Sequence, residues 1–163
     1  RRVADLARSI ATTLELDADA VDTIRMAGAI HDLGKISIPA ELLSKPGRLN
    51  SAEFDLIKTH SEVGYDILKT IDFPWPIAEV VYQHHERIDG SGYPQGLTGE
   101  QINIGARVIA VTDVVEAMAT HRPYRAALGV EVALGEIRKN RGRLYDPRVV
   151  DACLQLFESG YEF

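Results

Sequence analysis

The sequence predicts an all-α protein that folds as a single helical domain. Apolar residues recur every three or four positions along most of the chain, which is the spacing of one helix face. Proline and glycine are concentrated in short stretches between these periodic segments. The chain has 163 residues, the size of one ordinary domain, and no internal repeat or low-complexity linker divides it. We therefore expect residues 1–163 to form one domain.

The N-terminal region predicts two helices followed by a loop. The first helix starts without a cap at the beginning of the chain, and its apolar stripe continues to Leu14. The second helix starts near residues 17–19, where a short acidic side chain can accept hydrogen bonds from free backbone N–H groups. Its stripe leads to His31. Residues 37–50 contain two prolines and a glycine, and we expect a loop with room for one helical turn.

Two further helices are expected in the middle of the chain. Asn50 and Glu53 have the spacing of a capping box and open a helix over about 51–69. Pro76 suits the start of the next helix. The apolar stripe of that helix extends to His84.

The C-terminal half predicts a long loop and three helices. Residues 86–103 contain four glycines and a proline, which indicates a loop. A strongly apolar helix follows over about 104–119. Its segment 107–111 is also compatible with a buried strand, but the neighbouring segments favour a helix. The last two helices are expected near 129–139 and 146–158.

The composition excludes several classes of protein. Hydrophobic residues make up 45% and charged residues 26%, the balance of a globular domain and not of a disordered chain or membrane bundle. The net charge of −6 argues against general nucleic-acid binding, which normally requires a basic surface. No stretch of about 18 apolar residues predicts a membrane span, and no signal peptide is recognisable. With Cys153 as its one cysteine, the chain forms no internal disulfide, and we expect a cytoplasmic protein.

Ionisable residues occupy positions on the helices where apolar residues belong. Burying such groups without partners costs several kcal/mol or more. Buried His–Asp hydrogen bonds explain any one of them well, but explain the whole set poorly. Imidazoles and carboxylates together suit Fe, Mn, Zn, Ni or Co, and six ligands suggest a two-metal centre of the kind that hydrolyses phosphate esters. The residues are His31, Asp32, His60, His84, His85 and Asp113.

Three motifs resemble those of a known family. Residues 31–35 read HDLGK, similar to the HD-x-G-K signature of the HD superfamily of metal-dependent phosphohydrolases. Residues 84–94 read HHERIDGSGYP, which resembles the more specific HHE-x-x-DG-x-GYP motif of the HD-GYP branch. Residues 122–125 read RPYR and match the same branch. The resemblance extends over essentially the whole chain.

The resemblance implies an HD-domain helical bundle with a long, Gly-rich GYP loop. It also implies a bacterial phosphodiesterase that hydrolyses cyclic di-GMP to linear pGpG, and in some members on to GMP, through a hydroxide bridging the metals. Two divalent ions are expected, Fe or Mn before Ni, Co or Zn. The resemblance implies that the six ionisable residues named above are the ligands of these ions, and that Asp32 bridges the two ions. The resemblance gives Asp32 and Lys35 catalytic roles, and the residues that contact or border the substrate are Lys35, Tyr93, Arg122 and Arg125.

The chain departs from the family pattern at its N-terminus. The family places a metal-binding histidine two or three positions before the segment that corresponds to residues 2–4, and the chain starts too late to include it. We therefore expect a first helix truncated at its N-terminus, in a larger protein with an N-terminal sensor or receiver domain.

Several alternatives remain open. One alternative is that the domain is a catalytically weak or inactive regulatory module. Such a module would bind either a cyclic dinucleotide or, through the GYP loop, a GGDEF-domain cyclase. A nucleoside polyphosphate is a third, less favoured substrate, and the sequence does not separate cyclic di-GMP from cyclic GMP–AMP. Lys35 is alternatively a solvated cation at a helix end. Arg122 and Arg125 are alternatively a surface pair, and Glu86 and Arg87 are assigned to the loop surface or to supporting the ligands.

Overall fold

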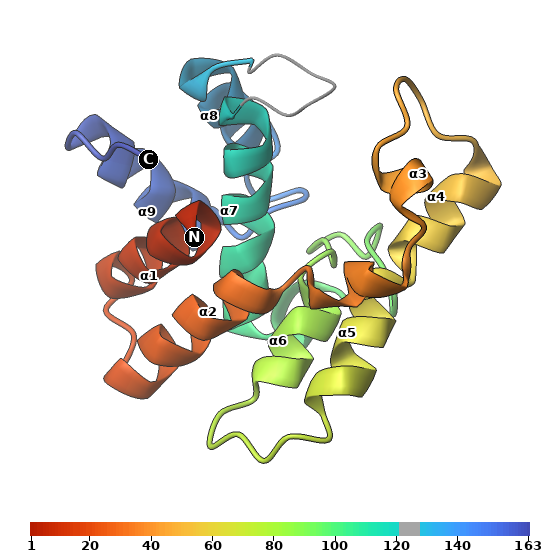
Figure 1. The fold of residues 1–163 in the computed structure, drawn as a ribbon. Helices are drawn as coiled ribbons and strands as arrows, with labels where there is room; N and C mark the ends of the chain where they lie inside the picture. The colour runs from red at the N-terminus through yellow and green to blue at the C-terminus, as the bar shows by residue number, and fades with distance from the viewer. Residues whose placement is uncertain (121–127) are drawn as a thin grey trace.

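The computed structural model describes residues 1–120 and 128–163 and shows a bundle of helices (Figure 1). The prediction of an all-α fold is confirmed, because the β-pairing among the described residues is limited to isolated bridges. The helical segments are α1 (Arg2–Thr13), α2 (Ala18–Ile30), η1 (Leu33–Ser37), α3 (Ala40–Leu43), α4 (Ser51–Lys58), α5 (His60–Leu68), α6 (Ile77–Gln83), η2 (Gly99–Gln101), α7 (Ile104–Ala119), α8 (Val130–Lys139) and α9 (Pro147–Glu158).

Helix α7 forms the centre of the bundle. It packs against α1, α2, α6, α8 and α9, and Val108, Ile109, Val111 and Val115 are fully buried. Burial on several sides explains why this segment is apolar nearly all round and shows no clean stripe. The helical interpretation of segment 107–111 is therefore confirmed, and the strand alternative is wrong.

Helices α1 and α2 form a closely packed pair that contacts α7. As predicted, Asp17 caps α2 by accepting a hydrogen bond from the Ala20 N–H at 2.8 Å. Gly28 allows close packing, because a Cβ added there would lie only 3.1 Å from the Cα of Ala4. Helix α2 ends at Ile30. The next residue, His31, is buried at the C-terminal end of this helix.

The helix expected over about 51–69 is interrupted, and the prediction of one continuous element is wrong. The capping box of Asn50 and Glu53 opens α4 as predicted. At Thr59, however, the backbone N–H and the hydroxyl both bond to the carbonyl of Leu56, only three residues back. This tighter turn separates α4 from α5, and α5 then begins at His60.

The long loop predicted after α6 is confirmed and is tied at its base. Residues 84–103 contain the short η2 turn and otherwise no helix. The side chain of Gln83 accepts a hydrogen bond from the Asn103 N–H at 2.7 Å, which joins the end of α6 to the start of α7. The expected one-turn helix in the 37–50 loop is α3.

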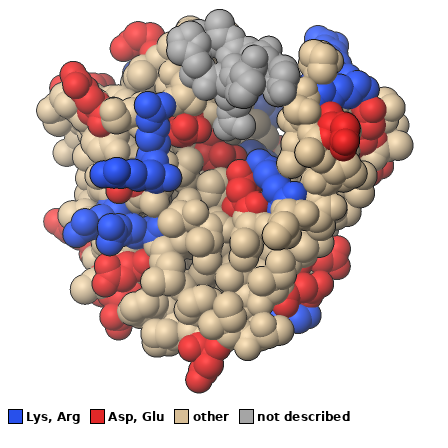
Figure 2. Space-filling view, in the orientation of Figure 1, with Lys and Arg blue, Asp and Glu red and all other residues tan. Residues whose placement is uncertain are grey.

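The described surface carries both signs of charge. Acidic and basic side chains are interspersed on the face shown in Figure 2, and the described residues form no continuous basic stripe there. Among the described residues, no helix combines the length and the apolar character needed to cross a bilayer.

Candidate metal centre

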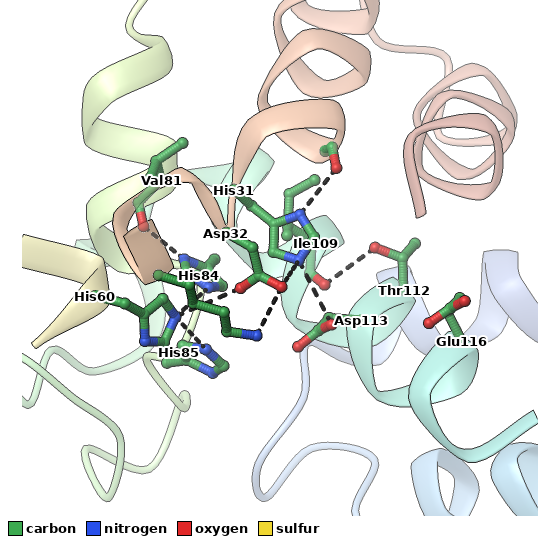
Figure 3. A network of polar contacts seen from close by, with 12 residues as sticks. His31, Asp32, His60, Val81, His84, His85, Ile109, Thr112, Asp113 and Glu116 are labelled. Carbon is green, nitrogen blue, oxygen red and sulfur yellow. Dashed lines mark hydrogen bonds and ion pairs between the residues drawn. The ribbon is translucent and has the colours of Figure 1, made fainter. Parts of the chain in front are cut away.

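Four separate parts of the bundle bring ionisable side chains to one place (Figure 3). The end of α2, the start of α5, the end of α6 and the middle of α7 each contribute at least one. All six candidate ligands predicted from the sequence belong to this cluster, and they are His31, Asp32, His60, His84, His85 and Asp113. Residues up to 82 positions apart in the chain therefore meet in a single centre.

Asp32 lies between two of the histidine rings. Its Oδ2 atom is 3.5 Å from Nε2 of His31, and its Oδ1 atom is 3.6 Å from Nε2 of His60. Asp113 approaches the same His31 atom, with Oδ1 at 3.5 Å. The two oxygens of Asp32 thus face two different groups of ligands, as a bridging carboxylate requires.

The remaining rings form a second group around His60. Its Nε2 atom is 3.4 Å from Nε2 of His84 and 3.1 Å from Nε2 of His85. The three residues offer ligand atoms that all lie within 4.8 Å of one another. This spacing allows one ion to be held by all three imidazoles.

Backbone carbonyls fix the tautomers of three rings. Nδ1 of His31, His60 and His84 each bonds to the carbonyl three residues earlier, at 2.8, 2.6 and 2.5 Å respectively. A carbonyl only accepts, so each Nδ1 must carry the proton and each neutral ring directs an Nε2 lone pair into the centre. Such bonds at the outer nitrogen are the usual way in which proteins orient histidine ligands.

Metal ions fit this arrangement of donor atoms. With Nδ1 protonated, the neutral rings of His60 and His84 direct unprotonated Nε2 atoms toward each other, a contact that a cation between them would stabilise. The buried Nε2 atom of His31 makes no hydrogen bond to a described residue, although oxygens of Asp32 and Asp113 each lie 3.5 Å away. An imidazole lone pair that faces two carboxylate oxygens is a set of donor atoms that a cation would satisfy.

The electrostatics of the centre also favour a cation. Burial lowers the pKa of His84 to about 3, and burial likewise lowers the pKa of His60 and of His85, so these rings are neutral ligands near pH 7. Burial opposes a charge on His31, but the carboxylates of Asp113 and Asp32 outweigh it and raise its pKa. Positive charge is therefore stabilised at the position where two carboxylates converge.

The glycine and lysine of the HDLGK segment have separate structural effects. The Lys35 ammonium donates to Oδ2 of Asp32 at 2.7 Å, so it lies at the edge of the centre. Gly34 packs directly against the carbonyl of His60, and a Cβ at this position would clash with that backbone atom. Glycine therefore lets η1 approach α5 closely enough for Asp32 to face His60.

Comparison with protein families decides the classification. A family model described as "HD domain" matches residues 1–149. The chain belongs to the HD domain family. Members are metal-dependent phosphohydrolases, so the family implies divalent metal ions, in agreement with the geometry of the centre. The resemblance predicted from the sequence motifs is confirmed.

Named relatives of this HD domain are phosphodiesterases. The Xanthomonas campestris "Cyclic di-GMP phosphodiesterase response regulator RpfG" is 44% identical over 156 residues, covering 94% of this chain and 41% of that protein. A Thermotoga maritima "Cyclic di-GMP phosphodiesterase" is 41% identical, over 95% of this chain and 43% of the relative. A Vibrio cholerae "3'3'-cGAMP-specific phosphodiesterase 1" is 35% identical, over 99% of this chain and 38% of that relative. The chain thus spans about two-fifths of these relatives.

Solved structures share the fold of this HD domain. The HDG"Y"P protein Bd1817 from Bdellovibrio bacteriovorus superposes with a TM-score of 0.77, at 17% identity over 96% of this chain and 50% of that one. The Vibrio cholerae cyclic GMP-AMP phosphodiesterase V-cGAP3 superposes with a TM-score of 0.75, at 18% identity over 98% of this chain and 43% of that one. The HD-domain helical bundle expected from the sequence is confirmed.

The GYP loop of the HD domain folds back onto a candidate ligand. The ring of Tyr93 stacks on the ring of His85, with centroids 4.8 Å apart and planes 23° apart. The backbone N–H of Tyr93 donates a hydrogen bond to the His85 carbonyl at 3.3 Å. A Cβ at Gly92 would lie 2.5 Å from Cα of Glu86, so only glycine permits this return of the chain. The loop therefore places Tyr93 beside the centre, where the sequence expected a substrate contact.

Glu86 has a role that sequence reasoning missed. The sequence assigns it to the loop surface or to ligand support, but the residue is only 2% exposed. Its two carboxylate oxygens accept hydrogen bonds from the N–H groups of Gln95 and Leu97, at 2.7 and 3.0 Å. Glu86 therefore anchors the loop from within, and the loop-surface assignment is wrong. The sequence shows only that an acidic residue directly follows two candidate ligands.

We expect Glu86→Gln to lower the free energy of unfolding by about 1–2 kcal/mol. The amide keeps the shape of the side chain but loses one charge-assisted acceptor, and hydrogen bonds to charged groups contribute more than neutral ones. Urea denaturation measures the change, and Glu62→Gln on the exposed face of α5 is the control. Equal stability of the two variants would contradict the anchoring role.

Two of the residues expected to contact the substrate lie outside the described residues, namely Arg122 and Arg125. The substrate contacts expected for Arg122 and Arg125 stay predictions.

A cavity reaches the centre from the side of α1. It has a volume of about 640 Å³, and its lining includes Arg2, His31, Asp32 and Glu116. The side chain of Asp32 is 39% exposed, whereas that of His60 is 1% exposed. The carboxylate group of Asp32 is thus accessible, while the ring of His60 is shielded.

Proposed function

We propose that this HD domain is a metal-dependent phosphodiesterase that hydrolyses cyclic di-GMP to linear pGpG. One observation carries the proposal: buried imidazole lone pairs and two carboxylates from four helical segments converge on one centre. The names of two relatives above 40% identity support cyclic di-GMP as the substrate.

We infer that two divalent ions, Fe or Mn before Ni, Co or Zn, occupy the centre. His31 and Asp113 would hold one ion, while His60, His84 and His85 would hold the other, with Asp32 between them. Mixed imidazole and carboxylate ligands suit these metals. Bound divalent ions supply Lewis acidity toward phosphoryl oxygens and lower the pKa of water toward neutrality.

Lys35 and Tyr93 complete the proposed machinery. The Lys35 ammonium projects to the edge of the centre, where its donors can meet the negative charge that develops on phosphoryl oxygens during cleavage. Tyr93 holds the ring of His85 by stacking and borders the substrate. Burial raises the pKa of the Tyr93 phenol to about 12, so it remains a neutral donor throughout the physiological range.

Cleavage of cyclic di-GMP by protein reconstituted with Fe or Mn tests the function. We expect linear pGpG as the product, and we expect a chelator to abolish cleavage and addition of the metal to restore it. Metal content is measured on the same samples. Cleavage that persists after complete metal removal would contradict the metal-dependent mechanism. A fully loaded protein that cleaves no cyclic di-GMP would contradict the proposed function.

A further inference from the structure

An exposed aromatic side chain lies beside the GYP loop. Phe54 of α4 meets the ring of Tyr93 edge-on, with centroids 6.3 Å apart and planes at 86°. Tyr93 in turn stacks on the candidate ligand His85. Phe54 is nonetheless 46% exposed, although a phenylalanine normally gains stability by burial. A short row of rings therefore leads from the metal centre to an open aromatic surface.

A lysine accompanies this aromatic surface. The Lys58 ammonium lies 5.2 Å from the Phe54 ring centroid and 5.9 Å from the Tyr93 centroid. Its ion pair with Asp55, at 2.7 Å, involves a carboxylate with 68% of its side chain exposed. Exposed pairs contribute little free energy, so this contact leaves the ammonium available to a ligand.

The same local arrangement occurs elsewhere without the loop. On α5, Lys69 lies 5.3 Å from the ring of Tyr65, four residues earlier, and pairs with Asp66, three residues earlier. Lys58 has the same spacing to Phe54 and Asp55. Helix periodicity explains these local contacts in both places. Only at Lys58 does a third group, Tyr93 from the loop, connect the lysine to the metal centre.

We propose that Phe54, Lys58 and Tyr93 form a nucleobase subsite, in which Lys58 selects guanine over adenine. This inference rests on the proposed function, because a phosphate at the metal centre carries its base outward along the row of rings. Aromatic faces stack on any base. Guanine presents the acceptors O6 and N7, whereas adenine presents an amino donor in place of O6. An ammonium only donates, and it therefore favours guanine.

Paired substrates test the selectivity. The ratio of kcat/KM for cyclic di-GMP to that for cyclic di-AMP is measured for the wild type, Lys58→Met and Phe54→Leu, with Lys69→Met as the matched control. We expect Lys58→Met to lower the ratio about tenfold. Phe54→Leu should lower both values about equally, because stacking is tolerant of the base. Lys69→Met should change neither value.

Binding of mononucleotides separates this inference from the proposed function. Equilibrium dialysis of the metal-loaded protein against GMP and AMP requires no turnover, and we expect tighter binding of GMP that Lys58→Met abolishes. An unchanged preference in Lys58→Met would overturn the subsite, even if the protein cleaves cyclic di-GMP. An equal loss for guanine and adenine ligands would also overturn it, because it would identify Lys58 as a phosphate contact. A guanine preference without dinucleotide cleavage would support the subsite and contradict only the phosphodiesterase proposal.

Discussion

Replacing Asp32 with alanine is expected to abolish both metal retention and cleavage of cyclic di-GMP. Among the described residues, Asp32 is the one whose two oxygens face both groups of ligands, toward His31 at 3.5 Å and His60 at 3.6 Å. Without it, each proposed ion loses a ligand, and the ion held by His60, His84 and His85 loses the carboxylate assigned to it. Turnover should fall to the background rate, and metal analysis of the purified variant should show loss of bound ions.

The fold of the Asp32→Ala protein should survive. Its side chain is 39% exposed and lies outside the apolar core, so its removal leaves no buried cavity. Circular dichroism verifies the helix content, and Asp72→Ala, at an exposed aspartate, is the matched control. His84→Ala should cause the same losses from the opposite side of the centre. An Asp32→Ala protein with full activity would refute the two-metal arrangement.

The helices and the convergence of the ligands could be predicted from the sequence for a physical reason. A helix places residues three and four apart on the same face, so an ionisable residue within an apolar stripe must point inward. His31, His84 and Asp113 each extend or interrupt such a stripe, and the structure places them in one cluster. Periodicity alone does not give their distances. Those depend on close contacts such as Gly34 against the carbonyl of His60.

The loop and the helix interruption could not be predicted in the same way. Periodicity carries no information about irregular segments, so the anchoring of residues 95 and 97 by Glu86 left no repeating pattern to detect. The contact between Phe54 and Tyr93 joins residues 39 positions apart and depends on the path of the loop. The interruption at Thr59 depends on hydrogen bonds to one carbonyl, while the apolar spacing continues across it.

Removing the ammonium of Lys35 is expected to slow catalysis more than it weakens binding. Lys35→Ala should lower kcat by about 10²–10³, the usual cost of losing one preorganised donor to a developing oxyanion. KM should change by much less, because the interaction strengthens only as charge develops in the transition state. Steady-state kinetics on metal-loaded protein provide both values.

The ion pair between Lys35 and Asp32 gives the Lys35 variant a second, structural interpretation, and a matched control separates the two. Lys45 makes an ion pair of the same length, 2.7 Å, with Glu53, which belongs to the capping box of α4 and to none of the contacts of the metal centre. Lys45→Ala should therefore leave kcat unchanged. Metal content of Lys35→Ala should equal that of the wild type, since an ammonium is not a ligand. A raised KM with unchanged kcat would show that Lys35 binds the ground state and transition state equally, and would refute its proposed catalytic role.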